Sequence, residues 1–185
     1  KPNYLIHCAG LSRPMKIHDH NISKSIELNI IGTANIVKAC NKFNIKLIYI
    51  STGYVYEGTK GNYSEEDGVK PFNNYGWSKL GGECSVKMYN NSLILRVTMT
   101  EKPFNFKTAY TNLISNFMYH EDFVGMLPKL INKKGIINVG GESQSIYKFA
   151  KSKNIKVKKA RLKNSKKLPL LQSMNLRKLT TILKK

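Results

Sequence analysis

The chain has 185 residues and a formal net charge of +20, from 31 basic and 11 acidic residues. This length suffices for one domain with a substantial core. The sequence contains no apolar run long enough to span a bilayer and nothing that resembles a signal peptide, so we expect a cytoplasmic protein without a membrane partner. The charge would suit nucleic acid, but arginine, which base and phosphate recognition favours, is scarce, so no nucleic acid partner is expected.

Metal binding is not expected either. Three cysteines lack the close pairing of a metal knuckle and are interpreted as reduced core residues: Cys8, Cys40 and Cys84. His18 and His20 flank Asp19 in a predicted loop, but no third and fourth ligand is in view. His7, inside a predicted strand, is interpreted as a core or crevice histidine with a satisfied hydrogen bond.

The first part of the chain predicts a strand–helix–strand unit. Apolar runs predict buried strands over Tyr4–Ala9 and Lys46–Ser51, and apolar residues at helical spacing predict a helix over Ser23–Phe43. The segment Leu11–Asn21 is polar, contains Pro14 and is predicted to be a loop. A strand, a helix and a strand with short connections form the crossover unit of a parallel sheet.

The remaining elements continue this alternation. Gly53–Asn74 is predicted to be a long loop, and loops of this length tend to be functional. Further helices are predicted over Tyr75–Tyr89, Glu121–Lys133, Ser145–Lys151 and Met174–Leu183, and Pro128 is expected to start or kink part of the second of these. Further strands are predicted over Ser92–Val97, Gly135–Val139 and Ile155–Lys159, and Thr98–Thr111 is predicted to be irregular. Alternating parallel strands and helices predict an open α/β sheet with helices on both faces.

A ligand site is expected at one edge of this sheet. In open α/β sheets, ligands bind beyond the carboxyl ends of the strands. Gly10, the pair Ser51-Thr52 and Thr98 each follow or end a predicted strand. These residues are therefore expected to line one crevice.

The stretch Leu47–Glu83 contains a candidate proton-transfer device. Tyr75 and Lys79 lie four residues apart at the start of a predicted helix and face the same way. The lysine ammonium and the helix amino terminus are expected to lower the pKa of Tyr75 from its usual value of about 10. Thr52 or Ser51 can share a hydrogen bond with the oxygen that changes charge. This arrangement suits general acid–base catalysis at a carbonyl or carbinol, with hydride exchanged by a cofactor.

These residues resemble a known pattern, S-T-D-Y-V-F-x-G followed by Y-x-E-x-D-x-x-x-P-x-N-x-Y-G-x-S-K-x-x-G-E. The matching positions are Ser51, Thr52, Tyr54, Val55, Gly58, Tyr63, Glu65, Asp67, Pro71, Asn73, Tyr75, Gly76, Ser78, Lys79, Gly82 and Glu83. His7–Gly10 is similar to an N-A-A motif, Asn29 with Gly32-Thr33 to N-x-x-G-T, and Ile137–Gly140 to Y-N-V-G. The chain thus resembles the extended short-chain dehydrogenase/reductase family, most closely its dTDP-4-dehydrorhamnose reductase branch.

The resemblance implies a Rossmann-like, doubly wound parallel sheet and a nucleotide-sugar enzyme that uses NADP or NAD. By it, Tyr75 is the catalytic acid/base, Lys79 is its pKa partner and a ribose-binding group, and Thr52 is the third catalytic member. The implied reaction is hydride transfer to the keto carbon of a nucleotide-linked 4-keto-6-deoxysugar, in the synthesis of surface polysaccharide precursors. A homodimer is left open.

The resemblance also implies positions for cofactor binding. These are Cys8, Ala9, Gly10, Tyr75, Lys79 and Val97. Asn29 is expected to be a structural support within its helix.

Two departures from the family pattern qualify this interpretation. Gly53 replaces the Asp that usually follows Ser-Thr, and the G-x-x-G-x-x-G turn that cradles a pyrophosphate is absent. We therefore expect a chain whose natural start is missing, with a sheet that lacks its first strand, glycine turn and helix. In the alternative case of a natural short form, dinucleotide affinity should be severely reduced. Residues 1–97 would form an incomplete dinucleotide-binding core, and residues 98–185 a small substrate-side lobe interleaved with the last strands of the sheet.

Two other functions stay open at this point. The same framework serves nucleotide-sugar epimerases and dehydratases. A catalytically inactive regulatory or binding relative is the non-enzyme alternative. The retained Thr52, Tyr75 and Lys79 argue against it, and the missing glycine turn argues for it.

Overall fold

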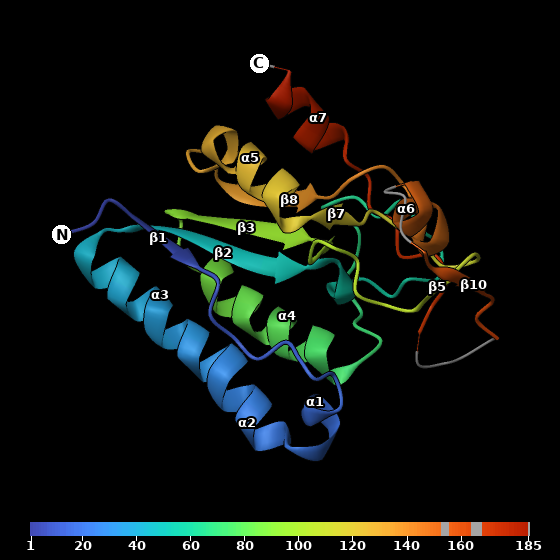
Figure 1. The fold of residues 1–185 in the computed structure, drawn as a ribbon. Coiled ribbons are helices and arrows are strands. Elements are labelled where there is room, and N and C mark those ends of the chain that lie inside the picture. The colour runs from blue at the N-terminus through green and yellow to red at the C-terminus, as the bar shows by residue number, and fades with distance from the viewer. Residues whose placement is uncertain (153–155, 164–167, 185) are drawn as a thin grey trace.

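A four-stranded parallel sheet forms the centre of the computed structural model, which describes residues 1–152, 156–163 and 168–184. Its strands are hydrogen-bonded in the order β1 (Tyr4–His7), β2 (Lys46–Thr52), β3 (Ser92–Val97) and β8 (Gly135–Val139). Every residue of β2 and β3 is buried, as expected for central strands covered on both faces. The predicted parallel α/β arrangement is confirmed, and the carboxyl ends of all four strands point to one side of the molecule (Figure 1).

Helices cover both faces of the sheet (Figure 1). One face carries α2 (Ile22–Ile26), the π-helix η1 (Glu27–Ile31), α3 (Gly32–Phe43) and α4 (Asn74–Lys87), and the other carries α5 (His120–Leu130) and α7 (Arg177–Leu183). The larger apolar cluster joins the sheet to α5 and α7 and includes Ile50, Leu95 and Ile137. A second cluster on the α3 and α4 side includes Leu47, Tyr49 and Ile94. Residues that alternate along the strands thus fill the two cores.

A smaller set of elements lies beyond the carboxyl ends of the strands (Figure 1). Three two-stranded ladders pair β4 (Met99–Thr100) with β7 (Met118–Tyr119), β6 (Ile114–Ser115) with β9 (Gln144–Ser145), and β5 (Thr108–Tyr110) with β10 (Lys158–Ala160). Together with α6 (Ile146–Ser152), they enclose a separate apolar cluster built around Phe104, Ala109 and Phe149.

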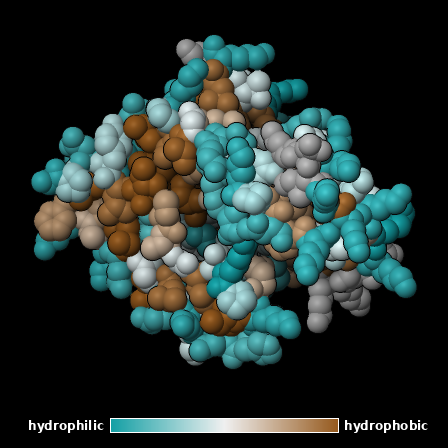
Figure 2. All heavy atoms as spheres, in the orientation of Figure 1, coloured by the Kyte–Doolittle hydropathy of each residue, from teal (hydrophilic) through white to brown (hydrophobic). Residues whose placement is uncertain are grey.

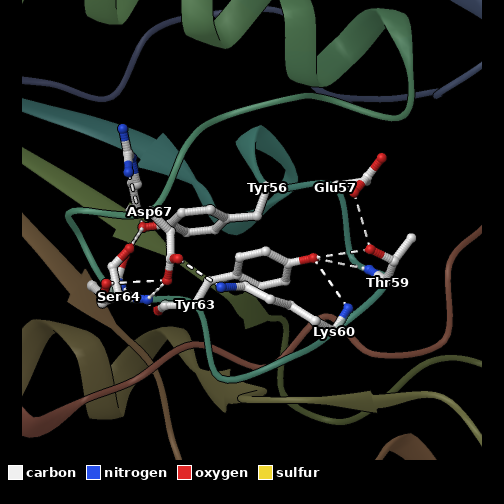
Figure 3. Close-up of polar contacts among 9 residues, drawn as sticks. Tyr56, Glu57, Thr59, Lys60, Tyr63, Ser64 and Asp67 are labelled. Atoms are coloured by element: carbon white, nitrogen blue, oxygen red, sulfur yellow. Dashed lines mark hydrogen bonds and ion pairs between the residues drawn. The ribbon is translucent and has the colours of Figure 1, made fainter.

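The long connection after β2 begins with the 3-10 turn η2 (Gly53–Val55) and is fixed by its own contacts (Figure 3). The Tyr63 hydroxyl accepts hydrogen bonds from the backbone N–H groups of Thr59 at 2.9 Å and Lys60 at 3.2 Å. The Tyr63 ring stacks on Tyr56 with centroids 4.8 Å apart. Most polar groups at the tip of this loop are therefore used within the loop.

The same loop is tied to the C-terminal part of the chain. Tyr63 forms a parallel β-bridge with Met174, and the Asn175 N–H donates to the Tyr63 carbonyl at 2.7 Å. The Asp67 carboxylate accepts a hydrogen bond from the Ser64 N–H at 2.7 Å, which closes the turn between them. These bonds give the long loop a structural role, because they connect the end of β2 to the segment that leads into α7.

The sequence-based boundaries were wrong in three places. The predicted loop Leu11–Asn21 contains a short helix, α1 (Ile17–His20), so the histidines flanking Asp19 are helical. The predicted helix Ser23–Phe43 is divided by the five-residue π-helix, and it ends where predicted, with Asn44 in the left-handed conformation at φ 50°. The helix predicted from Met174 begins only at Arg177, since Met174 pairs with the loop instead.

Two further expectations also changed. Pro128 lies inside α5 and neither starts nor ends it. The edge strand predicted over Ile155–Lys159 is found as β10, which pairs with β5 and does not extend the main sheet; Ile155 lies outside the described residues.

The visible surface is uneven in character. In Figure 2, hydrophobic residues gather on the side where β1 and α5 lie, while hydrophilic residues cover most of the rest of this face. Tyr4 and Ile6 of β1 are 44% and 43% exposed, and β1 pairs only with β2 among the described residues. No helix in the described part of the chain combines the length and apolarity that crossing a membrane would require.

Candidate active site

Parallel pairing brings the predicted site residues to one edge of the sheet. Thr52, the last residue of β2, is in register with Val97 at the end of β3, and His7 ends β1 beside β2. Thr98 directly follows β3, and Gly10 lies three residues after the end of β1. The sheet thus assembles the edge that the sequence predicts.

Helix α4 is held very close to this edge. Its first turn is capped by the Asn73 side chain, which accepts a hydrogen bond from the Gly76 N–H at 2.8 Å. At Gly82, a Cβ would lie 2.5 Å from the Tyr49 hydroxyl and 2.8 Å from the Asn29 carbonyl oxygen. The glycine permits a backbone approach that no other residue allows, and this approach places the helix carrying Tyr75 against β2.

Tyr75 lies among aromatic side chains. Its ring centroid is 5.1 Å from that of His18 and 6.0 Å from that of Tyr54. Burial raises the pKa of Tyr75 to about 12, while a hydrogen bond with the Thr52 side chain and the charge of Arg13 act in the opposite direction. The sequence led us to expect a lowered pKa; that expectation was wrong, because desolvation outweighs the groups that favour the phenolate.

Lys79 is buried and its ammonium group lies over an aromatic ring. The Nζ atom is 4.1 Å from the centroid of the Tyr49 ring, a cation–π contact. Burial lowers the pKa of Lys79 to about 8, although the Glu83 carboxylate and the Cys8 thiol act to raise it. The same ammonium lowers the pKa of His7, after the larger effect of burial. The positive charge of Lys79 is therefore directed at the end of β1 as well as at α4.

The residues expected to bind a cofactor fall into two groups. Cys8, Ala9 and Gly10 are exposed directly after β1, beside the Lys79 ammonium. Val97 is buried and packs in the main apolar cluster. An exposed backbone segment next to a buried ammonium fits the ribose and nicotinamide of a dinucleotide, because it offers close approach, hydrogen bonds and one positive charge.

The sequence led us to expect Asn29 to support only its own helix, but its contacts extend to two other elements. Its side chain accepts a hydrogen bond from the Leu11 N–H at 2.7 Å and donates to the Leu11 carbonyl and to the Ser78 Oγ, both at 2.8 Å. Asn29 therefore joins η1, the loop after β1 and α4. His7 has the satisfied hydrogen bond that was expected, with its Nε2 3.0 Å from the Thr33 Oγ1.

Gly53 occupies the position where the family pattern has an aspartate. A Cβ there would lie 2.9 Å from the Thr98 Oγ1 and 3.2 Å from the Met174 Sδ. The space for a carboxylate is therefore filled by two other side chains, and this side of the site carries no charge at that position.

A buried polar network lies beneath the site and includes Tyr56, which is labelled in Figure 3. The Arg96 guanidinium donates to the Glu83 carboxylate, with Nη2 2.8 Å from Oε2, and to the Tyr56 hydroxyl at 2.8 Å. The Tyr56 hydroxyl in turn donates to the Asn138 Oδ1 at 2.9 Å. Since these residues come from α4, β3, β8 and the long loop, the network fixes α4 relative to the sheet.

The sequence pattern did not point to three neighbours of Tyr75: His18, Tyr54 and Arg13. Tyr54 matched the family pattern without a role, and His18 was considered only as a metal ligand. Within the described residues no group of three or more His, Cys, Asp or Glu side chains could hold a metal ion. Arg13 comes from a predicted loop, and local spacing carries no signal for its approach to Tyr75.

Comparison with known proteins places these observations in a family. The family model for the RmlD substrate binding domain matches residues 1–117. The chain is 38% identical over 98 residues to methionine adenosyltransferase 2 subunit beta of Bos taurus, a match covering 52% of this chain and 29% of that protein. It is 31% identical over 102 residues to dTDP-4-dehydrorhamnose reductase of Aggregatibacter actinomycetemcomitans, covering 54% of this chain and 34% of that protein.

Solved structures agree with the fold. A hypothetical dTDP-4-dehydrorhamnose reductase from Sulfolobus tokodaii superposes with a TM-score of 0.84 at 26% identity, over 98% of this chain and 74% of that one. The dTDP-4-dehydrorhamnose reductase of Bacillus anthracis, solved in complex with NADP, gives 0.83 at 27% identity, over 97% and 74%. The chain spans about a third or less of the curated relatives it matches. With its matched sequence, parallel sheet and Tyr75–Lys79 helix, it belongs to the RmlD substrate-binding-domain family.

Proposed function

We propose that this protein is a binding subunit of a larger enzyme assembly, and that it holds a nicotinamide dinucleotide, NADP or NAD, at the carboxyl edge of its sheet. The observation that carries this proposal is the burial of Tyr75 against the rings of His18 and Tyr54, which raises its pKa to about 12. A phenol whose pKa lies so far above neutral pH is poorly matched to proton exchange, since a catalytic acid/base works best with a pKa near the working pH.

The electrostatics around Lys79 support the same conclusion. Its ammonium makes a cation–π contact with the Tyr49 ring, and the Tyr75 hydroxyl forms its hydrogen bond with the Thr52 side chain. Lys79, Cys8 and Gly10 would hold the ribose and nicotinamide. Several curated relatives at 37–38% identity are named as subunit beta of an enzyme, which favours a subunit role over independent turnover.

A second function is reduction of a nucleotide-linked 4-keto-6-deoxysugar, as the resemblance to reductases implies. The observation that favours it is that Thr52, Tyr75 and Lys79 are all retained and converge at one edge. In this reaction a bound NADPH would supply hydride to the keto carbon. Tyr75 would donate its proton to the sugar oxygen, and Thr52 would hold that oxygen by a hydrogen bond.

One experiment separates the two functions. NADPH binding is measured by titration calorimetry, and NADPH oxidation is followed with a dTDP-4-keto-6-deoxysugar, for the wild type and for Tyr75→Phe. The subunit proposal expects saturable binding in both proteins and the same background oxidation in both. Turnover in the wild type that is lost in Tyr75→Phe would establish the reductase instead. Absence of NADPH and NADH binding would overturn both.

A further inference from the structure

An ion pair connects two loops at the carboxyl edge of the sheet. Arg13, in the loop after β1, donates from Nη1 to the Glu101 Oε1 at 3.0 Å, and Glu101 follows β4. The Arg13 guanidinium also lies 6.0 Å from the centroid of the Phe106 ring. The pair therefore bridges the segments that follow the first and third strands of the sheet, the side on which ligands of such sheets bind.

Arg13 lies beside the aromatic residues of the site. Its charge reaches both Tyr54 and Tyr75, where it opposes the effect of burial on the pKa of each phenol. The Tyr54 ring is 6.0 Å from Tyr75 and 5.1 Å from Phe72, centroid to centroid. A cationic guanidinium thus stands at the margin of a group of aromatic side chains that includes Tyr75.

The Arg13–Glu101 pair is easily exchanged. Both side chains are about half exposed, at 53% and 52%, and ion pairs of this kind contribute little to stability. Only Nη1 is used by Glu101, and within the described residues Nε and Nη2 have no hydrogen-bond acceptor. A planar guanidinium with free donors binds phosphate oxygens in a bidentate manner, which the far more numerous lysines cannot do.

The other arginines are not placed to bind a phosphate at this edge of the sheet. The chain has four: Arg13, Arg96, Arg161 and Arg177. Arg96 is buried and paired with Glu83, and Arg177 begins α7 on the far face of the sheet. Arg161 follows β10, outside the edge that Tyr75 and Thr52 occupy.

We propose that Arg13 is the anion-recognition residue of this site, that it takes a phosphate group of a nucleotide ligand, and that Glu101 is the carboxylate which this phosphate displaces. The inference rests on the proposed dinucleotide site, and it adds the residue that selects for a phosphate-bearing ligand. The phosphate can belong to the dinucleotide itself or to a nucleoside diphosphate bound beside it.

Calorimetric titrations with dTDP, ADP-ribose and NADPH test the inference. The proteins are the wild type, Arg13→Gln, Arg13→Lys, Glu101→Gln and the control Arg177→Gln. We expect Arg13→Gln to weaken the binding of at least one of these phosphate-bearing ligands at least tenfold, and Arg13→Lys to recover only part of this loss. Glu101→Gln should strengthen binding several-fold, because the competing carboxylate is gone. Arg177→Gln should leave every affinity within twofold of the wild type.

The ligand affected identifies the source of the phosphate. Loss of dTDP binding alone assigns Arg13 to a nucleoside diphosphate beside the cofactor, and a parallel loss for ADP-ribose and NADPH assigns it to the dinucleotide. Equal small losses in Arg13→Gln and Arg177→Gln would overturn the inference, because they would reflect the general positive charge. Unchanged affinities in Arg13→Gln with intact NADPH binding would overturn it while leaving the proposed function standing. If the wild type binds none of the three ligands, both fail.

Discussion

The ammonium group of Lys79 is the charge that the proposed cofactor site offers at the end of β1. It is buried, lies 4.1 Å from the Tyr49 ring centroid, and faces the exposed segment after β1. Burial holds the pKa of Lys79 at about 8, against 10.5 for a free lysine. A change of pH within the ordinary working range will therefore remove this charge, which is unusual for a lysine.

Affinity for NADPH should consequently fall as pH rises through about 8. Below that pH, the protonated Lys79 would donate hydrogen bonds to a ribose hydroxyl; above it, the neutral amine would lose the charge that strengthens them. Fluorescence titrations of NADPH from pH 6.5 to 9.5 measure this effect. Lys79→Gln should bind weakly with a flat profile over the same range, and a flat wild-type profile would contradict the role given to Lys79.

At the scale of elements, the contact between α4 and its neighbours decides the geometry of the site. Gly82 faces the Tyr49 hydroxyl and the Asn29 carbonyl at distances that exclude a methyl group. Gly125, in the middle of α5, has no neighbouring atom within 4 Å of the position where a Cβ would stand. A glycine-to-alanine substitution would therefore meet a crowded contact in α4 and open space in α5.

Gly82→Ala should lower the free energy of unfolding by about 1–3 kcal/mol, because the forced displacement of α4 exceeds the helix-propensity gain of about 1 kcal/mol. Gly125→Ala should raise it by up to about 1 kcal/mol, since only propensity changes there. Urea denaturation of the two variants and the wild type measures both. An unchanged or higher midpoint in Gly82→Ala would show that α4 is not held by this close approach.

The sequence predicts the regular elements well and the long-range contacts poorly. β3 and β8 have the predicted bounds, because a fully buried parallel strand is a continuous apolar run with clear ends. The four-residue α1 was missed, since it is short and follows a proline. The strand ladders after Val97 could not be found, because each pairs short segments whose partners are distant in sequence.

The candidate site shows the same division. The convergence of Thr52 and Tyr75 follows from motif spacing and strand order. The direction of the pKa shift of Tyr75 does not, because it depends on desolvation by His18 and Tyr54, which only the folded chain brings together.

For the molecule as a whole, one buried ion pair links its layers. Glu83 of α4 and Arg96 of β3 are each 4% exposed. Arg96 also donates a hydrogen bond to the Tyr56 hydroxyl, which donates one to Asn138 of β8. Burying two charges is costly, so such a pair gives little net stability by itself. Its effect lies in what happens when one partner is removed, since the remaining charge is then left buried without its counterion.

Glu83→Gln should therefore destabilise the protein by about 3–5 kcal/mol, because Arg96 is left buried without a carboxylate. The matched control is Glu142→Gln, which breaks a pair with Lys148 that is 66–70% exposed and 3.4 Å long; it should change stability by less than about 0.5 kcal/mol. Combining Glu83→Gln with Arg96→Met should recover much of the loss, since the Arg96 charge is then no longer buried without its carboxylate. Urea midpoints measure all three. A loss under about 1 kcal/mol in Glu83→Gln would mean that water or another group reaches Arg96, and that α4 is held to the sheet by apolar packing alone.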